Sequence, residues 1–296
     1  LFGLSNDHEP RAGQLTTVTG LHADITKPEQ VRAAVAEARP DLIFHLAAQP
    51  SVALSWADPS GTLAINAGGA VHLCEALRAE RMAPRVVFVG SGEQYGLVRP
   101  EENPVTEACP PRPVNPYAVS KATQDLYGYL YFTAYGLPIM RARPFNHFGP
   151  GQAETFVIAG FARQIALIEA GLVGPELAVG NLRAKRDFLP VTDVVRAYVA
   201  IAERGQPGES YNVGSGHARA ISEILSCLLD MARVPIQLRE DPARFRPVDV
   251  PMLYADTSHL RAGTGWEPVE EFERVLAWTL DYWRAIVTQE NPSVWT

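Results

Sequence analysis

Residues 28–48, PEQVRAAVAEARPDLIFHLAA, run from a predicted helix into a predicted strand, and this step indicates the fold class. Pro28 suits the first helical turn, where its missing N–H costs nothing, and Pro40 ends the helix. Between these prolines apolar residues recur at helical spacing, at Val31, Ala34, Val35 and Ala38. The apolar run at 41–48 then predicts a buried strand.

The same step from helix to strand recurs twice further along the chain. A helix over 62–78 leads into the strand RVVFVGS at 85–91. A longer helix over 117–135, entered through a proline and ended at a glycine, leads into the strand PIMRARP at 138–144. Strands that alternate with helices in this way favour an α/β fold, a Rossmann-like doubly wound parallel sheet with helices on both faces.

Beyond Gly149 the alternation loosens, because glycine and proline interrupt it repeatedly. This change of pattern favours a smaller mixed α/β lobe, with a helix near 191–202 returning to the sheet. We therefore expect one large unit at 1–148, with 188–214 returning to it, and a lobe made of 149–187 and 215–296.

Composition limits the class of protein. In 296 residues, 47% are hydrophobic and 20% charged, which suffices for a globular core. The 26 basic and 33 acidic side chains leave a net charge of −7, which argues against a nucleic-acid partner. The three cysteines match neither disulfide nor metal-site spacing, and no apolar run reaches the roughly 18 residues of a membrane span. We expect a cytoplasmic protein without a metal site or a membrane contact.

Two further expectations concern single positions. The chain opens at Leu1 without a methionine, on a stretch that looks like the end of a strand, so we expect an N-terminal truncation. His45 lies within the apolar run at 41–48, and we expect it to be a core residue with its hydrogen bonds satisfied.

The pattern Tyr117-Ala-Val-Ser-Lys121 carries the strongest chemical information. A spacing of four places both side chains on one face of a helix, so that an ammonium lies near a phenol. A nearby cation and the helix N-terminus both favour the phenolate, which would lower the tyrosine pKa from its usual value near 10 and make Tyr117 a usable acid/base. Ser91 lies just past the run RVVFVG at 85–90, at the end of a parallel strand where ligand groups gather.

With GEQYG at 92–96 and RPFNHFGPGQ at 143–152, these residues resemble the extended short-chain dehydrogenase/reductase family, also called NAD-dependent epimerase/dehydratase. The resemblance covers essentially the whole chain and is strongest to members that act on GDP sugars, the GDP-4-dehydro-6-deoxy-D-mannose reductases and the GDP-mannose 4,6-dehydratases. It implies that Ser91, Tyr117 and Lys121 form a catalytic triad. It also implies that Glu93 stands where the dehydratases hold a base for carbon 5.

The resemblance implies a nicotinamide cofactor, NADP(H) or NAD(H), in the large unit and the substrate in the lobe. The family's Gly-rich turn for pyrophosphate is absent here, so we expect weak cofactor binding. Asn6 stands where the reductases have an arginine for a 2′-phosphate, which leaves the choice between NAD and NADP open. Besides Tyr117 and Lys121, the implied cofactor contacts are Asp24, Leu46, Ala47, Ala48, Asn66 and Pro144.

The resemblance also implies a GDP-sugar site. Arg246 would hold the diphosphate, because a guanidinium fork matches phosphate oxygens, and Asp249 would accept from ribose hydroxyls. The remaining implied substrate contacts are Asn146, Phe156, Val157, Phe161 and Arg186.

Several activities fit these motifs. The first is reduction of GDP-4-dehydro-6-deoxy-D-mannose to GDP-D-rhamnose, and the second is dehydration of GDP-mannose. The same motifs also fit a nucleotide-sugar epimerase and a non-catalytic nucleotide-binding relative. Relatives commonly pair through the helix that carries the tyrosine, so we expect a homodimer with Leu126, Tyr127, Leu130 and Tyr131 facing outward. A lobe of the same chain packed on these residues would explain their apolar character equally.

Overall fold

The computed structural model describes residues 2–5, 19–245, 248 and 250–290. The chain divides into two compact units, each built from three segments. The first unit comprises Leu1–Gly96, Pro110–Arg143 and Tyr198–Tyr211, and the second comprises Leu97–Cys109, Pro144–Ala197 and Asn212–Thr296. The segment that returns to the first unit is thus shorter than the expected 188–214, and a short excursion at 97–109 joins the second unit.

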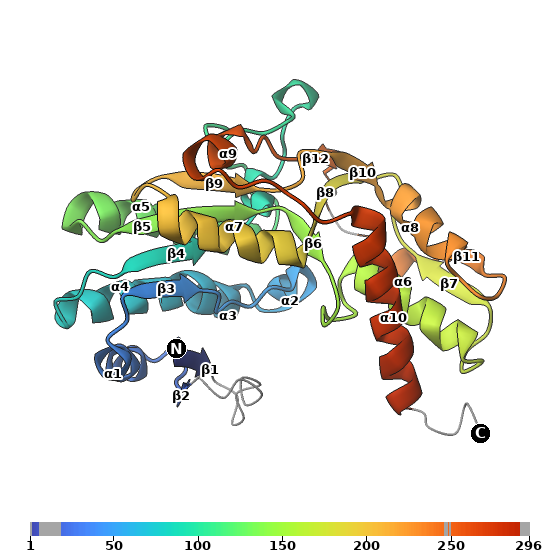
Figure 1. Cartoon of the computed structure of the whole chain (residues 1–296), viewed down its shortest axis with the longest axis horizontal. Helices are drawn as coiled ribbons and strands as arrows, with labels where there is room; N and C mark the ends of the chain where they lie inside the picture. The colour runs from blue at the N-terminus through green and yellow to red at the C-terminus, as the bar shows by residue number, and fades with distance from the viewer. Residues whose placement is uncertain (1, 6–18, 246–247, 249, 291–296) are drawn as a thin grey trace. The chain divides into compact units, whose positions relative to one another are not determined.

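A four-stranded sheet forms the centre of the first unit (Figure 1). Its strand order is β3 (Leu42–His45), β4 (Arg85–Val89), β5 (Ile139–Pro144) and β9 (Ser210–Val213). The first three strands are parallel, with Phe44 opposite Val87 and Val87 opposite Met140. This arrangement confirms the α/β fold with a Rossmann-like parallel sheet.

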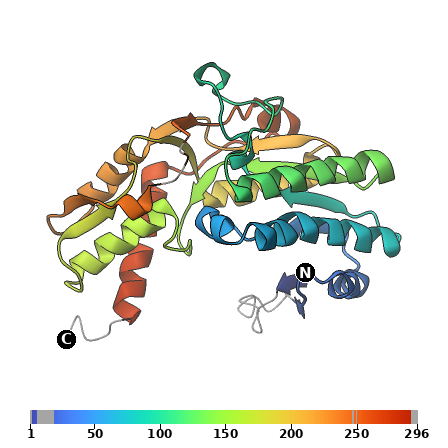
Figure 2. The ribbon, with the colours of Figure 1, turned by 180° about the vertical axis from the view of Figure 1, so that it is seen from behind.

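Helices cover both faces of this sheet. α4 (Gly69–Ala79) and α5 (Pro116–Tyr135) lie on one face, which Figure 2 shows in front. The end of α7 (Val191–Arg204) lies on the other face, where the guanidinium of Arg85 donates to the carbonyls of Ala202 at 2.5 Å and Gly205 at 2.6 Å.

The remaining elements of the first unit are mostly short. β1 (Phe2–Ser5) and β2 (Thr19–His22) form a separate parallel pair. The helical elements are α1 (Pro28–Ala38), α2 (Val52–Ala57), α3 (Pro59–Leu63), the π-turn η2 (Ala64–Gly68) and the 3₁₀ turn η3 (Gly92–Tyr95). The helix expected over 62–78 is therefore interrupted by a π-turn, while α1 has the expected bounds.

The core of the first unit lies between the sheet and helices α1, α4 and α5. Its largest buried members include Leu77 and Phe88, and burying such a side chain stabilises the fold by roughly 1.5–3 kcal/mol. Strand β3 is an exception, since Leu42 is 40% and Phe44 37% exposed. The expectation of a buried strand was wrong at these two positions, which share one face of the edge strand β3.

His45 is buried as expected, but one of its two ring nitrogens lacks the expected hydrogen bond within the described residues. Its ring packs against Phe88, with the ring centroids 5.3 Å apart. Among the described residues its Nε2 atom has no hydrogen-bond partner. Burial, with a smaller contribution from the charge of Lys121, lowers the pKa of His45 to about 3, so the ring stays neutral.

The second unit is mixed α/β. Its elements are η4 (Pro100–Glu102), β6 (Asn146–Phe148), α6 (Val157–Glu169), β7 (Glu176–Val179), β8 (Lys185–Pro190), β10 (Ala218–Ala220), α8 (Ile221–Asp230), β11 (Gln237–Glu240), η5 (Pro242–Arg244), β12 (Met252–Leu253), α9 (Ser258–Thr264) and α10 (Phe272–Glu290). One sheet has the order β10-β8-β12 with β6 also paired to β8, and β11 pairs with β7.

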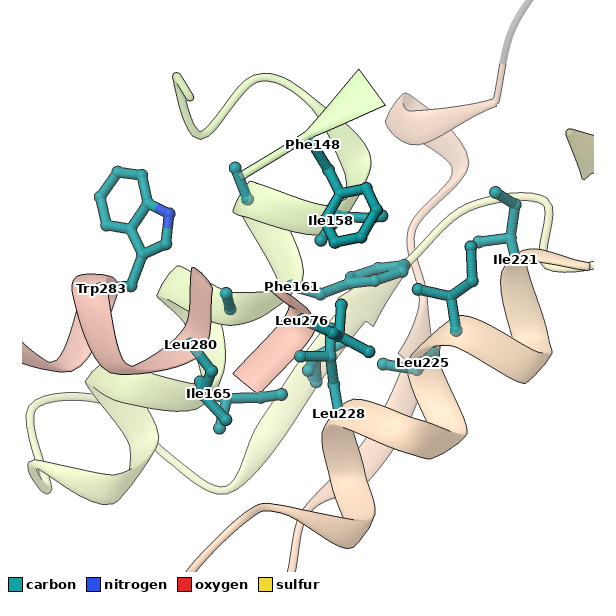
Figure 3. Packing of buried hydrophobic residues seen from close by; sticks show 14 of the residues in the cluster. Phe148, Ile158, Phe161, Ile165, Ile221, Leu225, Leu228, Leu276, Leu280 and Trp283 are labelled. Carbon is teal, nitrogen blue, oxygen red and sulfur yellow. The ribbon is translucent and has the colours of Figure 1, made fainter. Parts of the chain in front are cut away.

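Helices α6, α8 and α10 enclose the core of the second unit (Figure 3). The ring centroids of Phe148 and Phe272 lie 4.8 Å apart, and Leu276 and Leu280 of α10 are fully buried. Throughout the described ranges, no helix combines the length and apolar character that crossing a bilayer requires.

Candidate active site

Ser91 lies two residues after the last residue of β4 and immediately before the turn η3, which it caps. The preceding Gly90 donates its N–H to the carbonyl of Ala142 at 2.8 Å, which holds the end of β4 against β5. Ser91 is buried, and its hydroxyl accepts from the N–H of Glu93 at 3.2 Å. Gly96 closes the turn with a φ of 57°, and a Cβ there would lie 1.8 Å from the carbonyl oxygen of Arg112. Only glycine therefore fits this turn.

Tyr117 lies in the first turn of α5, close to Ser91 and Glu93. The helix begins where the side chain of Asn115 accepts from the N–H of Ala118 at 2.8 Å. Burial raises the pKa of Tyr117 to about 12; its hydrogen bond with Ser91 lowers the pKa, and the charge of Glu93 raises it. The sequence predicted a lowered pKa, but burial outweighs the stabilisation of the phenolate.

Lys121 lies one turn further along α5, and its ammonium points to the end of β4. Nζ donates to the carbonyl of Val89 at 2.7 Å and to Oε1 of Gln124 at 3.0 Å. Burial lowers the pKa of Lys121 to about 7. In the part of the chain that the structure describes, its third N–H has no protein acceptor. A buried donor of this kind suits a hydroxyl group on a bound ligand.

Asn66 lies on the π-turn η2 and is fully buried. Its side-chain oxygen accepts from the N–H of Gln49 at 2.7 Å, and its nitrogen donates to the Gln49 carbonyl at 3.1 Å. The same nitrogen donates to Ser120 at 2.9 Å, and the Ser120 hydroxyl donates to the Tyr117 carbonyl at 2.7 Å. Asn66 thus ties the loop after β3 to α5. Its predicted contact with a cofactor stays a prediction.

The other cofactor positions of the first unit lie at the surface. Leu46 and Ala47, directly after β3, are exposed, and Ala48 is half-buried. Asp24 accepts through Oδ1 from the N–H of Thr26 at 2.8 Å and from its hydroxyl at 2.7 Å, and these bonds lower the pKa of Asp24. The carboxyl ends of parallel strands are where such folds bind ligands, and the cofactor contacts predicted at these positions stay predictions.

A buried ion-pair network, which the sequence analysis did not predict, connects α5 to β5 near this site. Asp125 of α5 accepts from Arg141 at 2.7 Å and from Arg143 at 2.9 and 3.0 Å, and Arg143 also donates to the Tyr95 hydroxyl at 3.0 Å. Burial alone would raise the pKa of Asp125, but the two arginines hold it below its usual value. Asp125 lies four residues after Lys121, and that spacing was the one available indication that it shares this helix face.

In the second unit, the structure places some of the predicted substrate residues in the interior. Arg186 of β8 is buried, and its Nη1 donates to the Lys185 carbonyl at 2.9 Å. Phe161 is only 4% exposed and belongs to the core shown in Figure 3, so its part in a base pocket stays a prediction. Phe156 and Val157, at the start of α6, are exposed.

The remaining predicted positions differ in burial and in whether the structure describes them. Pro144 ends β5 and is buried, and Asn146 of β6 is half-buried and lies opposite Phe188 of β8. Arg246 and Asp249 lie outside the described residues.

Comparison with known proteins identifies the family. The family model described as GDP-mannose 4,6 dehydratase matches residues 4–279. The chain belongs to this family. The GDP-6-deoxy-D-mannose reductase of Pseudomonas aeruginosa is 38% identical over 251 residues, which are 85% of this chain and 83% of that protein. GDP-mannose 4,6 dehydratase 2 of Arabidopsis thaliana is 31% identical over 268 residues, 88% of this chain and 70% of that protein.

A solved member has a closely similar fold. The structure of RMD from Pseudomonas aeruginosa complexed with NADPH matches with a TM-score of 0.85 at 35% identity, and the match covers 93% of each chain. Membership in the GDP-mannose 4,6-dehydratase family confirms the resemblance inferred from the tyrosine, lysine and serine motifs.

Proposed function

We propose that the chain is a nicotinamide-dependent oxidoreductase that reduces GDP-4-dehydro-6-deoxy-D-mannose to GDP-D-rhamnose. The observation that carries this proposal is the meeting of Ser91 and Tyr117 at the end of β4, one helical turn from the buried ammonium of Lys121. The substrate class rests on the identity of 38% to a GDP-6-deoxy-D-mannose reductase.

The protonation state of Tyr117 matches the proton-donor role that a reduction requires. Burial raises its pKa to about 12, so the phenol carries its proton at neutral pH. Reduction of a carbonyl at carbon 4 needs a proton on the oxygen, and Tyr117 donates it while Ser91 binds the same oxygen. When bound, NADP(H) or NAD(H) supplies the hydride. Lys121 would hold the ribose through its third N–H, and its charged form would favour the phenolate that Tyr117 becomes.

The remaining cofactor and substrate contacts are proposals of the same kind. For the cofactor these are Asp24, Leu46, Ala47, Ala48, Asn66 and Pro144. For the GDP sugar they are Asn146, Phe156, Val157, Phe161, Arg186, Arg246 and Asp249. The first unit would then bind the dinucleotide and the second the sugar nucleotide.

We also propose that the protein is a cytoplasmic homodimer. Leu126, Tyr127 and Leu130 of α5 are exposed, and a second copy of α5 would cover them. Tyr131, which we expected to face outward, is buried, and its hydroxyl donates to Glu75 at 2.6 Å.

Dehydration of GDP-mannose is the second candidate, and one observation favours it. The carboxylate of Glu93 is half-buried and close enough to Tyr117 to raise the tyrosine pKa through its charge. A carboxylate in this place could remove the proton from carbon 5 after oxidation at carbon 4.

A product assay separates the two activities. The protein is offered GDP-4-dehydro-6-deoxy-D-mannose with NADPH or NADH, and separately GDP-mannose with NADP⁺, and products are identified by NMR. Cofactor oxidised in proportion to the keto sugar consumed establishes the reductase. Keto sugar formed from GDP-mannose without net change of cofactor establishes the dehydratase, and inversion at carbon 4 an epimerase. Binding without turnover of any substrate would overturn the assignment of an enzyme.

A further inference from the structure

Lys121 and Gln124 form a buried pair on α5. They are three residues apart on the helix, so their side chains lie on neighbouring positions of one face. Lys121 is 3% and Gln124 0% exposed, and Nζ lies 3.0 Å from Oε1 of the glutamine. A buried ammonium needs acceptors, because burial without them strongly disfavours its charge.

The Val89 carbonyl closes a triangle with this pair. It accepts from Nζ of Lys121 at 2.7 Å and from Nε2 of Gln124 at 3.3 Å. The two bonds determine the orientation of the amide. If the amide were flipped, its NH₂ group would face an ammonium and its oxygen would face a carbonyl oxygen, and both contacts would be repulsive.

None of the other charged or titratable groups around the ammonium accepts a hydrogen bond from it within the described residues. From β3, His45 is neutral because its pKa is about 3. On α5 itself Tyr117 is protonated because its pKa is about 12. The charge of Glu93, in η3, contributes to raising the pKa of that tyrosine. Asp125 of α5 is engaged by arginines from β5.

Two neutral dipoles, the Val89 carbonyl and the Gln124 amide, are therefore the acceptors of this ammonium within the described ranges. The Val89 carbonyl belongs to the backbone and does not depend on the type of side chain at that position. Gln124 is therefore the acceptor that a side chain of α5 contributes.

We propose that Gln124 is a positioning residue, which holds the Lys121 ammonium at the carboxyl end of β4 and stabilises its charged form. This inference deepens the proposed function, since it concerns the lysine assigned to that active site. It makes a statement about Lys121 that can be tested without a cofactor or a substrate.

The composition of the chain makes the test direct. The sequence contains three lysines, Lys27, Lys121 and Lys185, and the other two are exposed. Labelling of lysine Cε with ¹³C therefore gives three side-chain NMR signals, of which one belongs to a buried amine. The assignment follows from a Lys121→Met variant, in which that signal disappears. The signal is followed against pH in the cofactor-free protein.

Two substitutions of Gln124 should move the titration midpoint of Lys121 in opposite directions. In Gln124→Glu a carboxylate replaces the amide oxygen, and an opposite charge at this distance should raise the midpoint by about one pH unit or more. In Gln124→Met the volume is kept but the acceptor is lost, so the midpoint should fall. The control is Gln164→Met, which removes amide bonds to the backbone of Ala178 in the second unit and should leave the midpoint unchanged.

A glutamine that only fills space would lower the stability in both variants without moving the midpoint in opposite directions. Midpoints that stay unchanged, or that move the same way in both variants, would overturn the proposal. Thermal unfolding of each variant verifies that the titrated protein is folded, and Gln124→Met keeps the test available if the buried glutamate prevents folding. Because no turnover is measured, a failure of the reductase assay leaves this result intact, and the converse also holds.

Discussion

The side-chain nitrogen of Asn66 donates to the hydroxyl of Ser120 at 2.9 Å, which joins the π-turn η2 to the helix that carries Tyr117 and Lys121. The same amide makes two bonds to the backbone of Gln49 in the loop after β3. The buried side chain of Asn66 therefore connects the loop after β3 to α5, the helix that carries the proposed acid Tyr117.

Replacing Asn66 by alanine should cost both stability and activity. The change leaves the N–H and carbonyl of Gln49 without their partner, and each lost bond should cost about 1 kcal/mol or more in the free energy of unfolding. Urea unfolding gives this cost. Ser120→Ala removes one of the three Asn66 bonds, together with the bond from the Ser120 hydroxyl to the Tyr117 carbonyl, and should cost less. Equal costs for the two variants would contradict the role of Asn66 in joining the loop after β3 to α5.

Replacing Tyr117 by phenylalanine should lower kcat by about 10²–10⁴-fold, because the proton donor for carbon 4 is lost while the ring still fills its place. Binding of GDP, measured by calorimetry, should persist. With a tyrosine pKa of about 12, the wild-type rate of reduction should show no loss from phenol ionisation up to about pH 10. A variant that turns over at the wild-type rate would remove Tyr117 from the mechanism.

His45 should make the protein sensitive to acid. The folded-state pKa is about 3 and the ordinary value is 6.5, so between these values the unfolded chain binds a proton that the folded chain does not. Stability is therefore lost as the pH falls through this window, by about 2 kcal/mol between pH 7 and pH 5.

In His45→Phe, which keeps a ring beside Phe88, this part of the pH dependence should disappear. Urea unfolding of both proteins at pH 7 and pH 5 measures the difference. An equal loss of stability in the two proteins would show that His45 is not its source.

Gly96 ends the turn that follows Ser91, and Gly136, at the end of α5, provides a control position for its substitution. Both have positive φ, 57° and 69°, but a Cβ would collide with Arg112 at Gly96 and meets nothing within 4 Å at Gly136. Gly136→Ala should cost only the left-handed backbone conformation, roughly 1–2 kcal/mol, and Gly96→Ala clearly more. Gly96→Ala should also lower activity, because the turn positions Ser91. Thermal unfolding and a reductase assay test both statements.

Dimer formation through α5 should depend on Leu130. A charged side chain there would be buried without a partner, so Leu130→Asp should give a monomer by light scattering at concentrations where the wild type is dimeric. Val195, on α7, is similarly exposed, and Val195→Asp should leave the molecular mass unchanged. A wild-type protein that is monomeric at all concentrations would end this proposal.

Local sequence rules determined the elements that carry the site. Pro116 and Gly136 delimit α5, because proline suits a first helical turn and glycine accepts the left-handed conformation after the last. The spacing of Tyr117 and Lys121 on that helix likewise needed no tertiary information.

Only the tertiary structure determined the burial, the hydrogen bonds and the pKa values of those side chains. The raised pKa of Tyr117, the bond from Asn66 to Ser120 and the buried position of Tyr131 all depend on segments that are distant in sequence. Periodicity specifies which face of a helix is apolar, but not which other element covers that face. Burial and long-range hydrogen bonds set the free energy of a charge, and both are properties of the packed fold.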